Sequence, residues 1–269
     1  MKRMSLFAFL AIICACVMWG GAATQAASCG KKEALTPEEA RRKKRWEALD
    51  EDLKGILTHL GKANKDVKSL KAAVDYKRAI PILEEEEKSD GSLVFKKPDM
   101  MALKLGEPRS QDAYSDGNYW WIVDHKDEQV EIYKVTKSSR RSQEAAFLKF
   151  AYGQSARELV AHYDVSLLKT KKVTRTVETA EGETEEKEFT EYSLKFVPAS
   201  EDAPARYSAV ETRVTDQRWL PHHITLHESE GEIVHEFKLQ DMKINAEVED
   251  KVFRYEPPKG YRVVRPGSV

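Results

Sequence analysis

Cysteine is scarce in this chain, and its position limits how the fold can be held together. The three cysteines stand at positions 14, 16 and 29 of 269 residues, so no internal disulfide can form beyond residue 29. An excess of charge of one sign is missing as well, because 44 basic side chains oppose 45 acidic ones. That balance gives no reason to expect a nucleic-acid partner. The fold must therefore depend on a hydrophobic core, which a chain of this length can bury.

Long apolar runs are also missing, apart from one near the start. Residues 6–18 are apolar and follow Lys2 and Arg3, but the run is too short to span a bilayer unaided. This pattern is typical of a signal peptide. We interpret residues 1–26 as that peptide, which predicts export from the cytoplasm.

The cleavage site has two interpretations. Small residues before Ala27 favour a cut after Ala26, which leaves residues 27–35 as a flexible leader. Lipobox-like residues before Cys16 and, more weakly, before Cys29 favour lipidation at one of these cysteines as the alternative. In the first case the mature protein is free in the periplasm, and in the second it is lipid-anchored.

The sequence also lacks recognisable catalytic motifs. The sequence contains no glycine-rich phosphate loop and no nucleophile elbow. Its acidic clusters at 84–87 and 183–186 fit solvated turns better than acid–base chemistry. We therefore expect a binding protein that is not an enzyme and uses no cofactor.

Four histidines near the C-terminus raise the question of a metal site. His223 and His227 have a spacing that suits zinc on a helix, but they lie in a predicted strand. Four strand residues span about 13 Å, so the two rings cannot reach one ion. A turn at 230–231 would pair His227 with Val234 and Leu226 with His235, so the two histidines would face opposite ways. We expect no metal and ordinary surface histidines.

One helix is predicted before the strands begin. Thr36 is a suitable N-cap, and Glu39 completes a capping box. The helix is expected to run to Leu60 and to stop at Gly61. Its apolar side chains recur at helical spacing and form one stripe that can pack on a sheet. These side chains are Trp46, Leu49, Leu53, Ile56, Leu57 and Leu60.

From residue 66 onward the apolar period changes to two, which predicts an antiparallel sheet. Turns are expected at 88–91 and 116–118. An acidic hairpin is expected to turn at Gly182. The predicted strands are 67–76, 79–83, 91–105 with a break at Pro98, 114–124, 128–135, 165–177, 189–198, 205–214, 219–228, 232–243 and 251–264.

The segment that begins at Gly91 carries the clearest side-chain pattern. With a period of two, Leu93, Phe95 and Lys97 share one side, and Met101 and Leu103 form a second row. An inward lysine in a closed core is costly unless it is paired. This face is therefore expected to border a cavity for an apolar ligand.

Two further groups of apolar residues fit such a cavity. Trp120 and Trp121 lie in a predicted strand, although the pattern does not decide which of them faces inward. The helical stretch around Phe147, Leu148 and Phe150 interrupts the strands and is amphipathic, so it is expected to cover the cavity as a lid.

Several of these stretches have the order and spacing of a known family. They resemble the outer-membrane lipoprotein carrier (LolA) family over about residues 53–264. The stretches that carry the resemblance are Gly91, Lys96-Lys97-Pro98, Met101-Ala102-Leu103, Ser115-Asp116-Gly117, Trp120-Trp121, Glu128-Gln129-Val130, Phe147-Leu148 and the terminal VFRYEPPKGYRVV.

The resemblance implies a half-open β-barrel whose helices form a lid over an acyl-binding cavity. It implies that Leu93, Phe95, Met101, Leu103 and the lid residues line or cover that cavity. Family members typically carry arginine before the proline, where it latches the lid, and Lys97 stands there in this chain. Lysine lacks the planar fork of arginine, so the latch is altered.

The sequence thus predicts an α+β protein with residues 36–269 as one domain. A strongly curved antiparallel sheet, a half-open β-barrel, is expected with a long N-terminal helix and a helical lid over an apolar cavity. By the resemblance, the protein would be a periplasmic carrier that acts as a chaperone for acylated lipoproteins or lipids. It would take them from an inner-membrane release complex to an outer-membrane receptor, and we expect a monomer. The alternatives are an envelope-stress sensor on the same scaffold and a lipid-anchored lipoprotein receptor.

Overall fold

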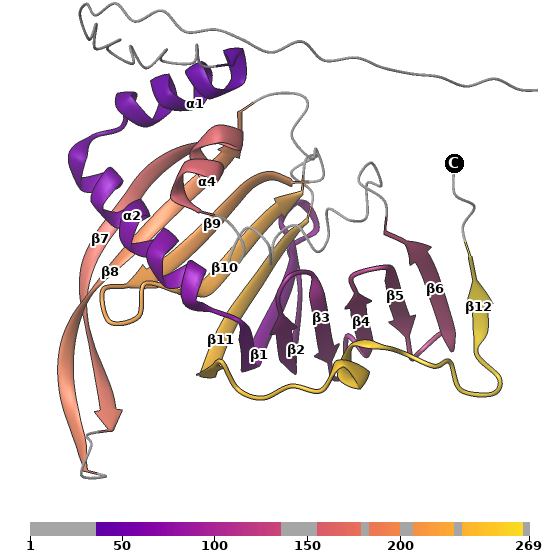
Figure 1. Ribbon diagram of the computed structural model, residues 1–269. Helices are drawn as coiled ribbons and strands as arrows, with labels where there is room; N and C mark the ends of the chain where they lie inside the picture. The colour runs from indigo at the N-terminus through magenta and orange to yellow at the C-terminus, as the bar shows by residue number, and fades with distance from the viewer. Residues whose placement is uncertain (1–35, 136–154, 179–182, 200–206, 229–232, 266–269) are drawn as a thin grey trace, which may run out of the picture. The chain divides into compact units, whose positions relative to one another are not determined.

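The computed structural model describes residues 36–135, 155–178, 183–199, 207–228 and 233–265 (Figure 1). The chain divides into two compact units, and the first unit, Met1–Leu35, lies outside the described residues. The signal peptide, the leader and lipidation at Cys16 or Cys29 therefore stay predictions. In the part of the chain that the structure describes, no helix has both the length and the apolar character needed to cross a membrane.

The second unit, Thr36–Val269, consists of one large sheet and short helices. The helical elements of the described residues are α1 (Pro37–Ala48), α2 (Glu51–Asp66), α4 (Ala156–His162) and the 3₁₀ turns η1 (Pro81–Leu83) and η3 (Asp250–Phe253). The strands are β1 (Ser69–Ile80), β2 (Glu85–Lys96), β3 (Met100–Leu105), β4 (Gln111–Asp116), β5 (Tyr119–Asp124), β6 (Gln129–Lys134), β7 (Tyr163–Glu178), β8 (Thr184–Pro198), β9 (Tyr207–Thr215), β10 (Pro221–Glu228), β11 (Val234–Ile244) and β12 (Arg262–Val264).

The strands form two meanders that meet in the middle of the sheet. The sheet order is β12-β6-β5-β4-β3-β2-β1-β11-β10-β9-β8-β7, so β1 pairs with β11 and the edges are β7 and β12. All pairs are antiparallel except β12 with β6. This large, open and curved antiparallel sheet confirms the predicted α+β class (Figure 1). The cavity and its lid stay predictions.

The two faces of the sheet bury different sets of side chains. We call the face that packs against α2 the inner face, where Leu57 and Leu60 of α2 join Leu70 of β1 in the main core. The opposite, outer face carries a smaller cluster around Tyr114 and Trp121. Phe253 of η3 is fully buried in that cluster, so the C-terminal segment covers this part of the outer face.

The predicted N-terminal helix is correct at its start and wrong at its end. Thr36 caps α1, and the capping box forms because Thr36 N donates to Glu39 Oε2 at 2.8 Å. The chain then leaves the helix at Leu49, because the Asp50 side chain accepts from Leu53 N at 2.7 Å and starts α2. Gly61 does not stop α2 but lies inside it.

A packing contact explains Gly61 better than a helix stop does. A Cβ at this position would lie 2.8 Å from Ala156 N. The glycine therefore lets α2 approach the start of α4 closely, which no local pattern in the sequence reveals. Ser155 caps α4 and forms a capping box with Glu158, as shown by the bond from Ser155 N to Glu158 Oε2 at 2.7 Å.

The predicted turn at 88–91 is also wrong, because these residues lie within β2. The chain turns earlier, at η1, where Pro81 begins the turn and Glu84 adopts a left-handed conformation with φ of 55°. Gly91 faces Leu105 across the β2–β3 pair, and a Cβ there would lie 2.1 Å from Lys104 O. The glycine permits a close approach of strands and does not form a turn.

The long C-terminal strand predicted at 251–264 is replaced by three different pieces. The chain forms η3, continues without regular structure through Pro257 and Pro258, and pairs with β6 only over Arg262–Val264. Proline has no backbone N–H, so two of them in succession prevent a continuous ladder.

The separate strand predicted at 79–83 does not form, because Ala79 and Ile80 end β1 and Pro81–Leu83 form η1. The remaining strands agree with the predicted ones within a few residues. The turn at Asp116–Asn118 is confirmed: Asp116 Oδ1 accepts from Asn118 N at 2.9 Å, and Gly117 has a φ of 88°. The acidic hairpin is an extension of β7 and β8, since β8 pairs with β9 only from Glu191 onward. We call residues 172–178 and 184–189 the β7–β8 arm (Figure 1).

Candidate ligand-binding site on the inner face

Four residues of the predicted acyl site lie together on the inner face. Phe95 of β2 is opposite Met101 of β3, and Leu93 is opposite Leu103. Phe95, Met101 and Leu93 are 1–2 % exposed, whereas Leu103 is 9 % exposed. The main core packs around all four, including side chains of α2. The shared face is therefore as the period of two predicted, but most of this row is packed core.

The two tryptophans lie on opposite faces of β5. Trp120 is part of the main core on the inner face, opposite Ser115 of β4. Trp121 is opposite Tyr114 and belongs to the outer cluster with Phe253. Because neighbouring strand residues point to opposite sides, only Trp120 can contribute to an inner cavity, and the inclusion of Trp121 is corrected.

The ammonium group of Lys97 forms hydrogen bonds with backbone carbonyls at the end of α2. Its Nζ donates to Asn64 O at 2.6 Å and to Lys65 O at 3.3 Å, in the last turn of α2. Burial lowers the pKa of Lys97, and the charge of Asp66 opposes that shift. Lys97 thus ties β2 to the C-terminus of α2, where a cation also interacts favourably with the helix dipole.

The predicted lid cannot be located. Phe147, Leu148 and Phe150 lie outside the described residues, so their role stays a prediction. The described end of that stretch is α4, which buries Leu159 and Val160 in the main core.

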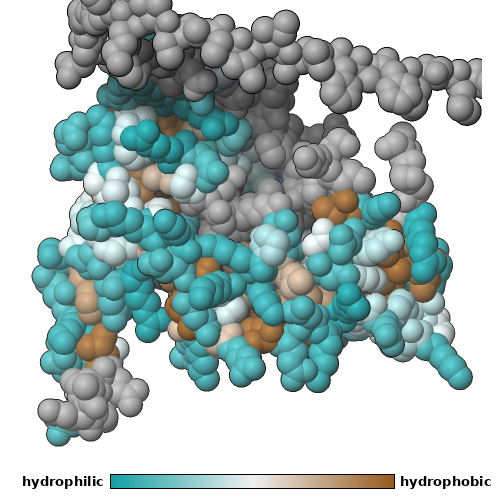
Figure 2. All heavy atoms as spheres, viewed as in Figure 1, coloured by the Kyte–Doolittle hydropathy of each residue, from teal (hydrophilic) through white to brown (hydrophobic). Residues whose placement is uncertain are grey.

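A pocket of about 350 Å³ opens on the inner face over β3 to β6, beside the packed core. Leu103, Ala113 and Ile122 line it and stand opposite one another in consecutive strand pairs. Ala113 and Ile122 are half-buried, so this apolar row stays partly accessible. On the face displayed in Figure 2, hydrophobic residues form patches separated by hydrophilic ones.

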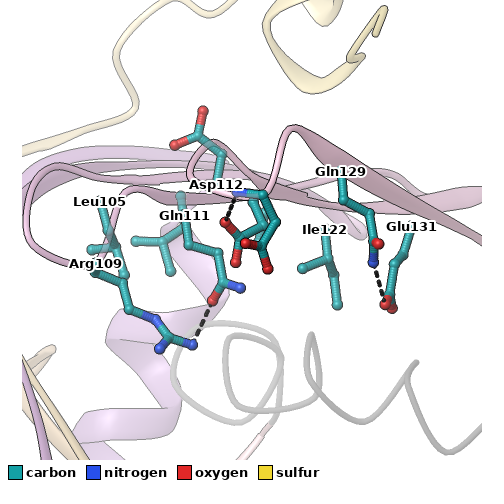
Figure 3. A pocket seen from close by; sticks show the side chains of 11 residues that line it. Leu105, Arg109, Gln111, Asp112, Ile122, Gln129 and Glu131 are labelled. Atoms are coloured by element: carbon teal, nitrogen blue, oxygen red, sulfur yellow. Dashed lines mark hydrogen bonds between the residues drawn. The ribbon is translucent and has the colours of Figure 1, made fainter. Parts of the chain in front are cut away.

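Polar side chains surround the apolar row and bond to one another. Arg109 Nη2 donates to Gln111 Oε1 at 2.7 Å, and Gln129 Nε2 donates to Glu131 Oε1 at 3.1 Å (Figure 3). In Figure 3 these four side chains project from the same side of the sheet as Ile122. The pocket therefore has an apolar floor and a hydrogen-bonded rim, an arrangement typical of sites for amphiphilic ligands.

The histidines are not ordinary surface residues, which corrects that prediction. His223 is 5 % exposed and its Nε2 lies 2.7 Å from Glu236 Oε1. His235 Nδ1 lies 2.9 Å from the Tyr76 hydroxyl. The predicted pairing of Leu226 with His235 is confirmed. Among the described residues, no group of three or more side chains is arranged to hold a metal ion.

Comparison with known proteins settles the family. A profile of the family described as "Outer membrane lipoprotein carrier protein LolA" matches residues 67–202, which is just over half of the chain. The chain belongs to the LolA family. Family membership supports a scaffold of the carrier type, in agreement with the resemblance that the sequence motifs showed. No curated protein matches the chain at a significant level.

Solved structures with a similar arrangement come from several bacteria. An uncharacterized conserved protein from Thermus thermophilus is 15 % identical, with a TM-score of 0.44, covering 80 % of this chain and 100 % of its own. A LolA superfamily protein from Nitrosomonas europaea is 14 % identical, with a TM-score of 0.36 and coverages of 73 % and 96 %. The Mycobacterium tuberculosis lipoprotein LppX is 11 % identical, with a TM-score of 0.36 and coverages of 72 % and 98 %. Values this low carry no functional argument.

Sequence reasoning missed the pocket residues Ala113 and Ile122. Alternation along 111–124 places them on one face, and the turn at Gly117 sets the pairing of the two strands. That alternation is the signal that could have found them, although the larger aromatic residues nearby give a stronger apolar pattern.

Proposed function

We propose that this LolA-family protein is an exported, non-enzymatic carrier that binds acyl chains of lipoproteins or lipids over β3 to β6. The observation that supports this most directly is the half-buried apolar row of Leu103, Ala113 and Ile122 on the floor of the inner-face pocket. A volume of about 350 Å³ lies within the range of roughly 300–1,000 Å³ for ligand sites.

The proposed binding needs no covalent step, because burial of the acyl chain alone can supply the free energy. Each acyl methylene that leaves water contributes about 0.8 kcal/mol, so a chain of moderate length supplies ample affinity before ordering costs are subtracted. The buried indole Nε1 of Trp120 has no hydrogen-bond partner within the described part of the chain. Trp120 lies on the same face as Ile122, two residues away, but it is packed in the main core and does not line the pocket.

The remaining parts of the proposal follow from the family. The cargo would be an acylated lipoprotein or lipid, received from an inner-membrane release complex and passed to an outer-membrane receptor. The protein would work in the periplasm as a monomer, and residues 147–150 would cover the bound chain. In this scheme Lys97 would act through α2, which it holds against β2.

The test uses two variants that change the pocket in opposite chemical directions. Ile122→Gln makes the floor polar, and Ala113→Trp fills the space with an apolar group. We expect each to weaken binding of a fluorescent fatty acid about tenfold or more, measured by titration of the purified protein. The matched control is Val197→Gln, which changes a 39 % exposed residue of β8 that does not line the pocket.

Folding is checked by circular dichroism and thermal melting of all four proteins. Unchanged binding in both pocket variants would place the acyl site elsewhere. Equal weakening in the Val197→Gln control would mean that the effect is not local to the pocket.

A further inference from the structure

A second pocket lies away from the acyl site, between the β7–β8 arm and the ends of β9 to β11. Its volume is about 940 Å³. Its charged lining is almost entirely basic, since Asp241 is the one carboxylate among the described lining residues. The basic side chains are Arg175, Arg213, Arg218, Lys238 and Lys243.

The register of three strands aligns part of this lining on the outer face. Arg213 of β9 is opposite His223 of β10, and His223 is opposite Lys238 of β11. Their sequence neighbours Ile224 and Phe237 belong to the main core on the inner face. Two cations thus flank a buried histidine in one row, at a strand spacing of about 4.8 Å.

Nearby acids offset only part of the positive charge, because each acid is shared among several basic side chains. Glu191 lies 2.9 Å from Lys171 but 3.6 Å from Arg175. Glu236 lies 2.7 Å from His223 but 3.8 Å from Lys238. These acids therefore contact their nearer partners more closely than they contact the pocket cations.

Among the residues that the structure describes, two pocket cations have no acidic partner. Within the described ranges, neither Arg213 nor Lys243 has a carboxylate within 4.0 Å, and both side chains are exposed. Exposed cations without acidic partners are suited to bind an anion.

The pKa values of two histidines in this pocket are lowered in part by its basic side chains. Burial, followed by the charge of Arg175, lowers the pKa of His222 to about 4. Burial, followed by the charge of Arg213, lowers the pKa of His223. Both rings therefore stay neutral near pH 7, and the permanent cations account for the charge of the pocket.

We propose that this pocket binds the phosphate of an anionic phospholipid headgroup. Arginine forks match phosphate oxygens with two parallel hydrogen bonds, and Arg213 supplies such a group. Arg175 and Arg218 each already contact a protein partner through one terminal nitrogen and have further N–H groups. The lining also includes the half-buried Met242, which suits the glycerol and upper acyl carbons, and the edges of the core residues Leu220 and Leu239. The pocket would hold the protein at an anionic membrane surface through residues separate from the inner-face site.

The test is co-sedimentation of the full protein with phosphatidylcholine vesicles, prepared with and without phosphatidylglycerol. We expect binding only when phosphatidylglycerol is present, and weaker binding as salt is raised. The double variant Arg213→Gln/Lys238→Gln should lower the partition coefficient about 30-fold, because each basic residue near an anionic surface contributes about fivefold.

A matched control removes the same net charge elsewhere. Lys126→Gln/Lys259→Gln changes two exposed lysines outside the pocket and should keep nearly all of the binding. Circular dichroism checks the fold of both double variants. The acyl-site proposal is tested separately, by fatty-acid titration of Ile122→Gln and Ala113→Trp, so failure of this proposal is distinguishable from failure of the acyl-site proposal.

Three outcomes would overturn the inference. One is equal binding to neutral vesicles, and another is equal loss in the two double variants. The third is binding of soluble glycerol 3-phosphate as tightly as vesicles, because it would make a free phosphate compound the ligand in place of a membrane lipid.

Discussion

His222 on β10 should make the stability of this protein fall in mild acid. Its Nε2 lies 2.9 Å from Arg175 Nη2 and 3.1 Å from Glu191 Oε2, and its side chain is 17 % exposed. Burial is the main reason that its pKa is lowered to about 4, and the Arg175 charge adds to it. In the unfolded chain an imidazole has a pKa of about 6.5. At a pH between these two pKa values, the unfolded state therefore binds a proton that the native state does not bind.

The sign and size of the effect follow from this difference. The contribution of His222 to stability is fully present above about pH 6.5 and is lost progressively as the pH falls toward 4. Between about pH 7.5 and 5.5, the proton taken up only by the unfolded state lowers the free energy of unfolding by about 1 kcal/mol. Over the whole window the loss is about 3 kcal/mol at most.

The assay is urea unfolding of the wild type and of His222→Gln at both pH values. The variant should lose about 1 kcal/mol less than the wild type between them. His162→Gln serves as the control for replacing a histidine by glutamine, since His162 is exposed at the end of α4. If His222→Gln and the wild type lose the same stability, His222 is not held neutral by its surroundings and the reasoning fails.

Two further predictions concern contacts that hold segments onto the sheet. Lys97→Met should lower the free energy of unfolding by about 1–2 kcal/mol, because the Asn64 and Lys65 carbonyls lose their donor, while Lys97→Arg should retain most of it. Urea unfolding compares the three proteins, and equal stability of Lys97→Met would contradict the tie to α2. Phe253→Ala should cost about 3–5 kcal/mol, because Phe253 is fully buried, and hydrogen exchange should quicken on the C-terminal segment before it does on α2. A cost below about 1 kcal/mol would mean that this segment does not seal the outer cluster.

Local signals in the sequence predicted local structure well. The Thr36 capping box, the Asp116–Asn118 turn and the pairing of Leu226 with His235 each depend on a few neighbouring residues. The two glycines were misjudged for the opposite reason. Gly61 and Gly91 allow close contact with the backbones of Ala156 and Lys104, which come near only in the folded chain.

The sequence was enough to predict which side of the sheet carries the candidate site. It was not enough to predict which of the apolar side chains there line an open pocket. A period of two correctly placed Phe95 and Met101 on one side of the sheet. Nothing in the sequence tells a packed apolar side chain from one that lines a pocket, because the hydrophobic effect favours either. The distinction depends on where α2 and its neighbours lie, and thus on long-range packing. The basic pocket was missed for a similar reason, since its cations come from β7, β9, β11 and the turn between β9 and β10, and they meet only in the folded sheet.

Strand alternation makes the two proposed sites structurally linked although they lie on opposite faces. In β10 the same alternation that buries Ile224 in the main core turns His223 toward the row with Arg213 and Lys238. A slip of β10 by one residue would exchange these faces, placing His223 in the core and Ile224 among the cations. Such a slip would remove core packing and the phosphate site together, whereas substitutions at Arg213 or Ile122 act on one face at a time. A sheet covered by α2 on its inner face can therefore offer an apolar pocket on that side and a basic pocket toward the other, and each can be tested without disturbing its counterpart.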